Sequence, residues 1–173
     1  MNAAVDFPFD LDAGHKTSVA VWDDVPPALT WREKIAFVGS RIIASDWPKT
    51  DCPVEHSFAP GQYIRTMRIP SQTLFLGRAH LLGHECTLVE GAVLYITPTS
   101  RCLIHAPHTV HTQPGDHMVL FTLTDIVGRT VHSNPNDSRD IQALEDQAFE
   151  RAEVLQALGH AVRERLDLLC YGT

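Results

Sequence analysis

The sequence predicts a mainly β protein, a single antiparallel β-barrel or jelly roll with helices on its N- and C-terminal sides. Between Cys52 and His132, short segments that favour extended backbone alternate with Pro, Gly, Asn and Asp, without a helical pattern between them. Before and after this region, apolar residues recur at helical spacing. The 173 residues are 44% hydrophobic and 20% charged, which is typical of one globular domain.

The chain divides into three predicted segments of one structural domain. Residues 1–51 form an N-terminal arm and a helix, residues 52–132 form the barrel, and residues 133–173 form a C-terminal helical segment. Within the arm, β-branched and aromatic residues favour a strand at Ser18–Trp22. Such an arm packs on a partner subunit or frays as a tail, and the sequence leaves both readings open.

The predicted helices flank the barrel. Thr30 and Glu33 form a capping box, and the apolar pattern after them predicts a helix to about Ser45. Trp47-Pro48 ends it, because the residue before proline disfavours helix. One or two further helices follow the turn after His132, with a possible kink at Gly159. Their apolar positions are Ile141, Leu144, Ala148, Phe149, Val154, Leu155, Leu158, Val162, Leu166 and Leu169.

Nine short strands are predicted within the barrel region. They are Val54–Phe58, Gln62–Ile69, Thr73–His80, His84–Glu90, Ala92–Thr97, Cys102–His105, Thr109–Gln113, His117–Leu123 and Thr130–His132. So many short strands without intervening helices are typical of an antiparallel sandwich or barrel.

Charge and hydropathy exclude several classes of protein. The net charge of −7 and the absence of a basic cluster argue against nucleic-acid binding. No apolar run approaches the ~20 residues that span a bilayer, and the first residues do not resemble a signal peptide, so we expect a cytoplasmic protein without a membrane partner. The cysteines form no close pair and are expected to be reduced; they are Cys52, Cys86, Cys102 and Cys170.

Histidines are concentrated in the barrel region, where seven of the ten lie from His80 to His132. Along one extended strand, His80 and His84 would lie about 13 Å apart at ~3.3 Å per residue, too far to share a ligand. A tight turn at Leu81-Leu82-Gly83 would instead let His80 end one strand and His84 begin its antiparallel neighbour. Both rings would then reach one ion, because neighbouring strands lie about 4.8 Å apart.

The segment around these histidines resembles the first motif of the cupin superfamily, G-x5-H-x-H-x3,4-E-x6-G. With Gly91 aligned on the last glycine, His84 takes the glutamate position and His80 that of the second histidine. Arg78 replaces the first histidine. The second motif is matched loosely by Gln113-Pro114-Gly115-Asp116-His117, where the histidine comes one residue early.

A closer resemblance is to small cupin-like proteins often encoded in bacteriophages and bacterial genomes. They share a segment like Pro53–Pro70, one like Gly77–Gly91, and a closing T-x-H element that here ends at His132. The resemblance covers about Pro53 to Glu145. It implies a cupin barrel, but this fold hosts epimerases, isomerases, dioxygenases, storage proteins and binding modules, so it does not name an activity.

The histidines are candidate metal ligands, with no organic cofactor expected. His80 and His84 come first, and either His117 or His132 completes the site. Neutral imidazoles suit a divalent transition metal (Zn, Fe, Ni or Mn), with Cu a further possibility for such ligands. Each of these histidines has an alternative reading as a hydrogen-bonded or exposed side chain at a strand end. His105, His108 and His111 are expected on the surface or in loops.

Other polar residues are candidates for ligand binding at the barrel mouth. The alternation of Gln62–Ile69 places Tyr63, Arg65 and Met67 on one face. Arg65 inside a barrel would need an anionic partner, either Glu90 or the carboxylate or phosphate of a ligand. The alternative is that Arg65 or Arg68 is exposed to solvent. Arg78 could likewise offer a charge near the histidines or face solvent.

Two functions from different classes follow. One is a metal-dependent cupin that acts on or binds a small polar ligand. The other is a non-catalytic cupin that binds a ligand or a protein, for example a phage protein that modulates its host. A homodimer is expected in either case, with the N-terminal arm and the C-terminal helices supplying apolar surface.

Overall fold

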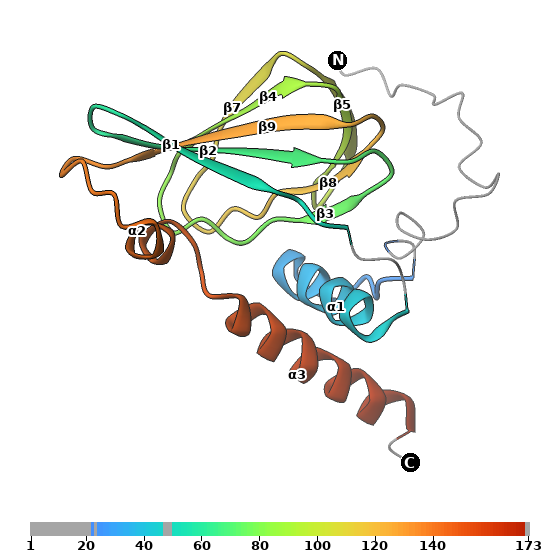
Figure 1. The fold of residues 1–173 in the computed structure, drawn as a ribbon. Coiled ribbons are helices and arrows are strands. Elements are labelled where there is room, and N and C mark those ends of the chain that lie inside the picture. Colours follow the sequence, from blue (N-terminus) through green and yellow to red (C-terminus); the bar gives the residue numbers. More distant parts are fainter. Residues whose placement is uncertain (1–21, 23, 47–49, 172–173) are drawn as a thin grey trace.

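Two antiparallel β-sheets face each other, and helices gather along one side of them (Figure 1). The structure is a computed structural model that describes residues 22, 24–46 and 50–171. No helix in these ranges is long and apolar enough to cross a membrane. The predicted strand Ser18–Trp22 lies outside them except for Trp22, whose ring stacks on that of Trp31 with centroids 5.4 Å apart.

Helix α1 (Trp31–Ala44) begins at the predicted capping box. The side chain of Thr30 accepts a hydrogen bond from the Glu33 amide, and the Glu33 carboxylate accepts one from the Thr30 amide at 2.9 Å. The helix ends at Ser45, as predicted, whereas the Trp47-Pro48 stop lies outside the described residues.

The nine predicted strands are confirmed, although several have different ends. In chain order they are β1 (Val54–Ala59), β2 (Gln62–Ile69), β3 (Leu74–Leu76), β4 (Glu85–Glu90), β5 (Ala92–Ile96), β6 (Arg101–His105), β7 (His108–His111), β8 (Val119–Thr122) and β9 (Ile126–Ser133). Strand β9 is longer than predicted because it pairs with β2 on one side and β4 on the other, which extends it through Gly128.

One sheet has the strand order β1-β2-β9-β4-β7 and the other β3-β8-β5-β6. This is the order of an eight-stranded jelly roll with β1 added at one edge. Of the predicted barrel or jelly roll, the structure shows the jelly roll, since no pairing among the described residues closes the two sheets into a barrel. The corner between β4 and β5 shows how the chain changes sheets: Gly91 has a φ of +90°, where a Cβ would overlap the carbonyl oxygen of Asp125.

Both faces of the four-stranded sheet are buried. On the outer face, Ile96 and Val119 pack with Ile35 and Val38 of α1. Toward the facing sheet, a second core cluster is formed by buried apolar side chains of four strands, which are Ile69, Val93, Leu120 and Ile126. The alternation of side chains along β5 and β8 therefore separates a helix-covered core from an interior one.

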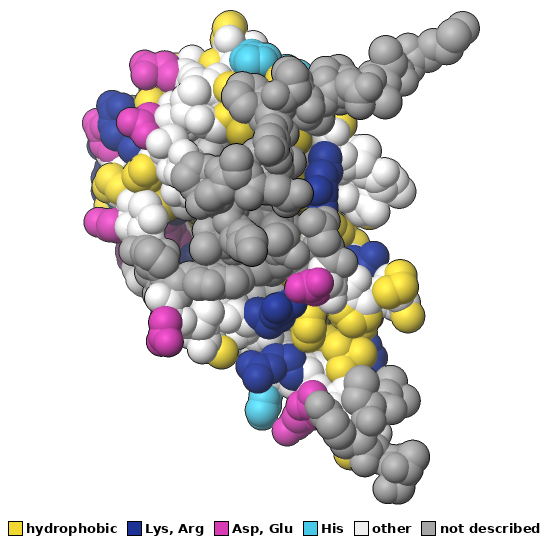
Figure 2. Space-filling view, turned by 90° about the vertical axis from the view of Figure 1, so that its right-hand side faces the viewer, with side chains coloured by type: hydrophobic (Ala, Val, Ile, Leu, Met, Phe, Trp, Pro, Cys, Tyr) yellow, Lys and Arg dark blue, Asp and Glu magenta, His cyan; other side chains and the backbone are white. Residues whose placement is uncertain are grey.

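Two helices follow the last strand, α2 (Ile141–Ala148) and α3 (Ala152–Tyr171). Helix α3 runs without a break through Gly159, where the sequence left a kink possible. At this glycine α3 crosses α1 so closely that a Cβ would lie 2.5 Å from the Ala36 carbonyl oxygen. Figure 2 shows hydrophobic side chains among charged ones over the lower part of the molecule, where these helices lie.

Candidate functional site

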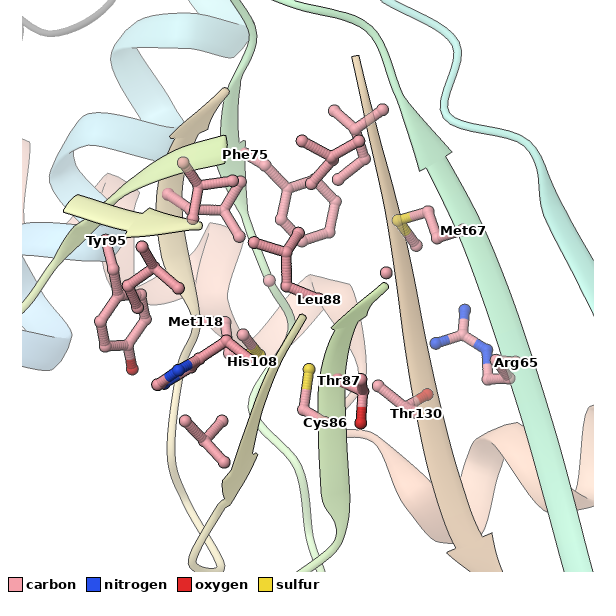
Figure 3. Close-up of a pocket in the computed structure, with 18 of the residues that line it drawn as sticks. Arg65, Met67, Phe75, Cys86, Thr87, Leu88, Tyr95, His108, Met118 and Thr130 are labelled. Carbon is pink, nitrogen blue, oxygen red and sulfur yellow. The ribbon is translucent and has the colours of Figure 1, made fainter. Parts of the chain in front are cut away.

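A cavity of about 340 Å³ lies between the two sheets (Figure 3). Most of its lining is apolar and comes from eight strands, β2 to β9, and their connections. The apolar side chains are Met67, Ile69, Phe75, Leu76, Leu88, Val93, Ile104, Val110, Met118, Leu120, Ile126 and Phe149. Polar groups lie at its margins, with Arg65 on one side of the view in Figure 3 and Tyr95 and His108 on the other.

Strand alternation explains which side chains face the cavity. Arg65 and Met67 of β2 lie opposite Thr130 and Gly128 of β9, and all four line the cavity. The predicted shared face of Tyr63, Arg65 and Met67 is therefore the inner face of the sheet, and Tyr63 is fully buried. Gly128 leaves open space, since a Cβ at this position would meet no atom within 4 Å.

Three histidines gather near Arg65, and we call His80, His84 and His132 the histidine cluster. Of the three, His80 lines the cavity. All three are buried. Ring centroids are 3.6 Å apart for His80 and His84, 4.8 Å for His84 and His132, and 5.7 Å for His80 and His132. His132 lies beside Tyr63 across the β2–β9 pair, so the cluster continues the inner face of the sheet.

The cluster forms without the predicted hairpin. That prediction is wrong because β3 ends at Leu76 and pairs with β8, whereas β4 pairs with β7 and β9 in the other sheet. The segment around His80 pairs elsewhere. The His80 carbonyl accepts a hydrogen bond from Gly115 at 2.7 Å, and His80 forms an antiparallel bridge with Phe149. A bend at residues 81–82 then brings His84 back beside His80, so the predicted proximity of the two rings is present.

Several nitrogens of the cluster have no hydrogen-bond partner within the described part of the chain. They are both ring nitrogens of His80 and Nε2 of His84. Nδ1 of His84 lies 2.5 Å from the Thr112 hydroxyl, and Nε2 of His132 lies 3.1 Å from the Thr130 hydroxyl. Buried polar atoms are usually paired, so unpaired imidazole nitrogens indicate a place where a ligand could bind.

The histidine cluster is uncharged at neutral pH. Burial, and then the neighbouring His84, His132 and Arg65, lowers the pKa of His80 to about 2. Burial, together with His84 and Arg65, lowers the pKa of His132 to about 4, and burial also lowers the pKa of His84. Desolvation disfavours the imidazolium form, so the cluster offers neutral donors and acceptors.

The other four histidines between His80 and His132 lie outside the cluster. His117 is buried, but its Nδ1 donates to the Gly77 carbonyl at 3.2 Å, and it lines a separate pocket beside α1 and α3. Of the two residues that the sequence left open as a third ligand, the structure therefore brings His132, not His117, to His80 and His84. His105, His108 and His111 are exposed, as predicted, although His108 also lines the cavity.

Arg65 and Arg78 share one carboxylate at this end of the cavity. Arg65 Nε lies 3.2 Å from Glu145 Oε1, and Arg78 Nη1 lies 3.8 Å from Glu145 Oε2. The ring of Phe149 lies under both guanidinium groups, 4.5 Å from that of Arg65 and 5.0 Å from that of Arg78. The expected partner Glu90 is instead exposed at the end of β4 and does not line the cavity.

Sequence reasoning therefore missed Glu145 and Phe149, which belong to helix α2 and its C-terminal end. Backbone bonds dock this end on the histidine segment: the Leu81 amide donates to Ala148 at 2.8 Å, and the Glu150 amide donates to Ala79 at 2.9 Å. A signal was present in the sequence, because Glu145 is a charged residue directly beside Leu144 on the buried side of a helix. An acidic residue there needs a basic partner.

The donor chemistry of the cluster suits a transition metal, since neutral imidazoles with free nitrogens are common metal ligands. The positions of these side chains, however, do not suit a bound metal ion. Among the residues that the structure describes, no three His, Cys, Asp or Glu side chains are placed to hold an ion together. At a centroid separation of 3.6 Å the rings of His80 and His84 pack against each other, which leaves no room for an ion between them.

No protein-family model matches the sequence, and the curated proteins contain no match to it. Among solved structures, the chain is similar to an RmlC-like cupin family protein with a double-stranded β-helix fold from Methanocaldococcus jannaschii. The identity is 9% over 48% of this chain and 80% of that one, with a TM-score of 0.41.

Two further structures show similarity of the same kind. An RmlC-like cupin protein from Ralstonia eutropha is 15% identical over 49% of this chain and 57% of its own, with a TM-score of 0.39. A protein with a double-stranded β-helix domain from Klebsiella pneumoniae is 11% identical over 53% of this chain and 85% of its own, with a TM-score of 0.43. At these identities the similarity concerns the fold alone.

The strand order describes the architecture of the chain directly. Strands β2-β9-β4-β7 face strands β3-β8-β5-β6, which is the arrangement of the jelly rolls to which cupins belong. The chain therefore has the strand order of a jelly roll, which is the architecture expected from the resemblance to cupins.

Proposed function

We propose that the protein binds a small molecule whose apolar body fills the cavity between the sheets and whose polar end meets the histidine cluster. The observation that carries this proposal is the cavity itself, about 340 Å³ in volume, with an apolar lining and polar groups at its margins. Small-molecule sites have this composition, mostly apolar with a few convergent polar groups. The volume is about twice the ~150 Å³ of an engineered cavity that binds benzene.

An apolar ligand body differs from the small polar ligand that the sequence suggested. The inner faces of the strands carry Met67, Leu88 and Ile126 where a polar site would need hydrogen-bonding side chains. A polar molecule placed there would lose its hydrogen bonds to water without replacing them. The end with Arg65 and the histidine cluster can accept its polar group, because charge and buried hydrogen-bonding nitrogens gather there.

We propose binding rather than catalysis because the nearby groups that could transfer a proton are already paired with other side chains. The hydroxyl of Tyr63 is hydrogen-bonded to His56 Nδ1 at 2.7 Å, and burial raises the pKa of Tyr63. The carboxylate of Glu145 is paired with two arginines. A general acid or base needs a proton that it can exchange with the substrate.

A neutral fluorescent probe tests the cavity. N-phenyl-1-naphthylamine titrated into the full chain should bind with one site per chain and gain fluorescence. The variant Gly128→Leu should abolish this binding, because its side chain would extend into the open space beside Gly128. Circular dichroism and thermal unfolding should show that the variant is folded.

The matched control is Arg129→Leu, which adds the same side chain one residue along β9. Arg129 is exposed, and neighbouring residues in a strand point to opposite faces, so this leucine lies outside the cavity. Probe binding should persist in the control. Absence of binding in the unchanged protein, or equal binding in a folded Gly128→Leu variant, would disprove the proposed function.

A second candidate function is metal binding by the histidine cluster. The observation that favours it is the set of unpaired, buried imidazole nitrogens on His80 and His84. It requires the His80 ring to turn away from His84. A bound divalent ion would supply a Lewis acid at the polar end of the cavity.

Elemental analysis tests this candidate on protein purified without a histidine tag. A metal-binding cluster should hold close to one transition-metal ion per chain, and His84→Ala should lose it while His117→Ala retains it. A metal content near zero after incubation with Zn²⁺, Fe²⁺, Ni²⁺ or Mn²⁺ and removal of the free ion would exclude the candidate. That result would leave the cavity proposal unaffected.

A further inference from the structure

We infer that the ligand is an amphipathic monocarboxylic acid, with its alkyl or aryl tail in the cavity and its carboxylate bound by Arg65 and Arg78. This inference rests on the proposed function, because it names the class of small molecule that the cavity takes. It is carried by the charge balance, the burial and the position of the two guanidinium groups.

The two arginines have one carboxylate between them. Glu145 contacts both, at 3.2 Å from Arg65 and 3.8 Å from Arg78. The neighbouring Glu150 does not balance the second charge, because its carboxylate is paired with Arg32 at 2.6 Å. Only its backbone carbonyl accepts a hydrogen bond from Arg78 Nε, at 3.0 Å.

Other titratable groups near this end do not change the balance of charge between the two arginines and Glu145. The three side chains of the histidine cluster are buried imidazoles, and none of them offers a carboxylate to either arginine. Asp116 acts on His84, but its carboxylate is exposed and accepts a hydrogen bond from the Gln113 amide at 2.7 Å. The end of the cavity therefore carries one positive charge more than its carboxylate neutralises, which matches a monoanion.

Because it is buried, the Arg65 guanidinium is the main binding group for the ligand carboxylate. Its side chain is 13% exposed, and its Nε makes no hydrogen bond, although it lies near Glu145. A buried guanidinium without full hydrogen bonding is costly, and a carboxylate satisfies it with charge-assisted bonds. Arg65 therefore has capacity for an acceptor in addition to its ionic contact.

The position of Arg65 joins the charged end to the apolar body. Met67 is the next inward-facing residue on the same strand, and Phe75 and Leu88 lie beyond it across the cavity (Figure 3). A molecule with its carboxylate at Arg65 would direct its tail along these side chains. The ring of Phe149 lies under both guanidinium groups and holds them at this end.

A carboxylate suits this end better than a phosphate. A phosphate monoester brings a charge of about −1.5 to −2 at neutral pH, more than the single uncompensated positive charge here. The planar carboxylate also matches the planar guanidinium group of Arg65. The ligand carboxylate would compete with Glu145 for the same two arginines.

The test compares decanoate with decanol, which share an alkyl chain and differ in the head group. Each displaces N-phenyl-1-naphthylamine from the full chain at about pH 8, where a carboxylic acid is ionised. Decanoate should bind at least about tenfold more tightly than decanol, the value of one charged hydrogen bond. Arg65→Gln should remove this preference, and Arg78→Gln should reduce it.

Glu145→Gln is the second, independent variant. It removes the competing carboxylate, so it should increase the preference for decanoate over decanol, a gain that a misfolded protein would not show. Equal binding of decanoate and decanol by the unchanged protein, or a preference that persists in folded Arg65→Gln, would overturn the inference. Displacement of the probe by decanol would still support the proposed function, whereas failure of the probe to bind would overturn both.

Discussion

The body of the cavity and its charged end are built in different ways. The body is made by strand alternation: side chains such as Met67 and Leu88 face inward because their strands pair in register across the sheet. The charged end is made by segments far apart in the chain, where Phe149 after helix α2 docks on His80 through an antiparallel bridge. The body therefore depends on local pattern, and the end depends on tertiary docking.

This difference also separates the energetics of the two regions. Apolar side chains stabilise the body through burial, roughly in proportion to their area. The end buries three histidines and an arginine, which are costly to desolvate and are stabilised by contacts with Glu145, Phe149 and nearby hydroxyls. Substitutions in the charged end, and changes of pH that affect it, should therefore change the free energy of unfolding more than those in the body.

The largest effect is expected at Phe149, which closes the charged end. Phe149→Ala should lower the free energy of unfolding by about 3–5 kcal/mol, because its 4%-exposed ring contacts His80, His132 and both arginines. Urea denaturation of the full chain measures this change. The control Phe149→Leu keeps most of the buried volume and should cost clearly less. A loss below about 1 kcal/mol for Phe149→Ala would mean that the end is not docked in solution.

The next effect is a pH dependence that the end has and the apolar body lacks. His80 and His132 have a pKa of about 2 and about 4 in the folded chain, against an ordinary value of 6.5. At a pH between the folded-state pKa and 6.5, each imidazole binds a proton in the unfolded chain but not in the folded chain. Stability is therefore complete above about pH 6.5 and falls as the pH decreases, by about 1.4 kcal/mol per pH unit for each such group.

Urea unfolding at several pH values, with a chelator present, measures this slope. Carboxylates also titrate in acid, so the informative quantity is the difference between the unchanged protein and His132→Gln. The variant should lose less stability between about pH 6.5 and 4. Parallel curves for the two proteins would contradict a neutral, buried His132.

The same division explains how much of the molecule could be predicted from the sequence. The strands, the capping box and the shared face of Tyr63, Arg65 and Met67 follow from local periodicity and are present in the structure. The pairing of the strands does not follow from it. The hairpin around Gly83 was wrong because β3 and β4 belong to different sheets, a choice made by long-range partners.

The site shows this limit more clearly. His80 and His84 were found because they are close in sequence, and His132 was one of two open alternatives to complete them. The partner of Arg65 was sought in Glu90, which is near the histidines along the chain, and is instead Glu145 on helix α2. Local pattern indicates that a buried charge needs a partner, but only tertiary packing selects which carboxylate it is.

The smallest effect is expected within the apolar body, at Gly128. Gly128→Ala should raise the free energy of unfolding by up to about 1 kcal/mol, because it restricts the unfolded chain and its methyl group meets no atom within 4 Å. Gly91→Ala is the control, since Gly91 has a φ of +90° and a Cβ there would overlap the Asp125 carbonyl, so this variant should be destabilised. Thermal or urea unfolding compares the two. If Gly128→Ala is destabilised as much as Gly91→Ala, the sheets close over the cavity in solution. The contrast between an open apolar body and a tightly docked charged end would then be lost.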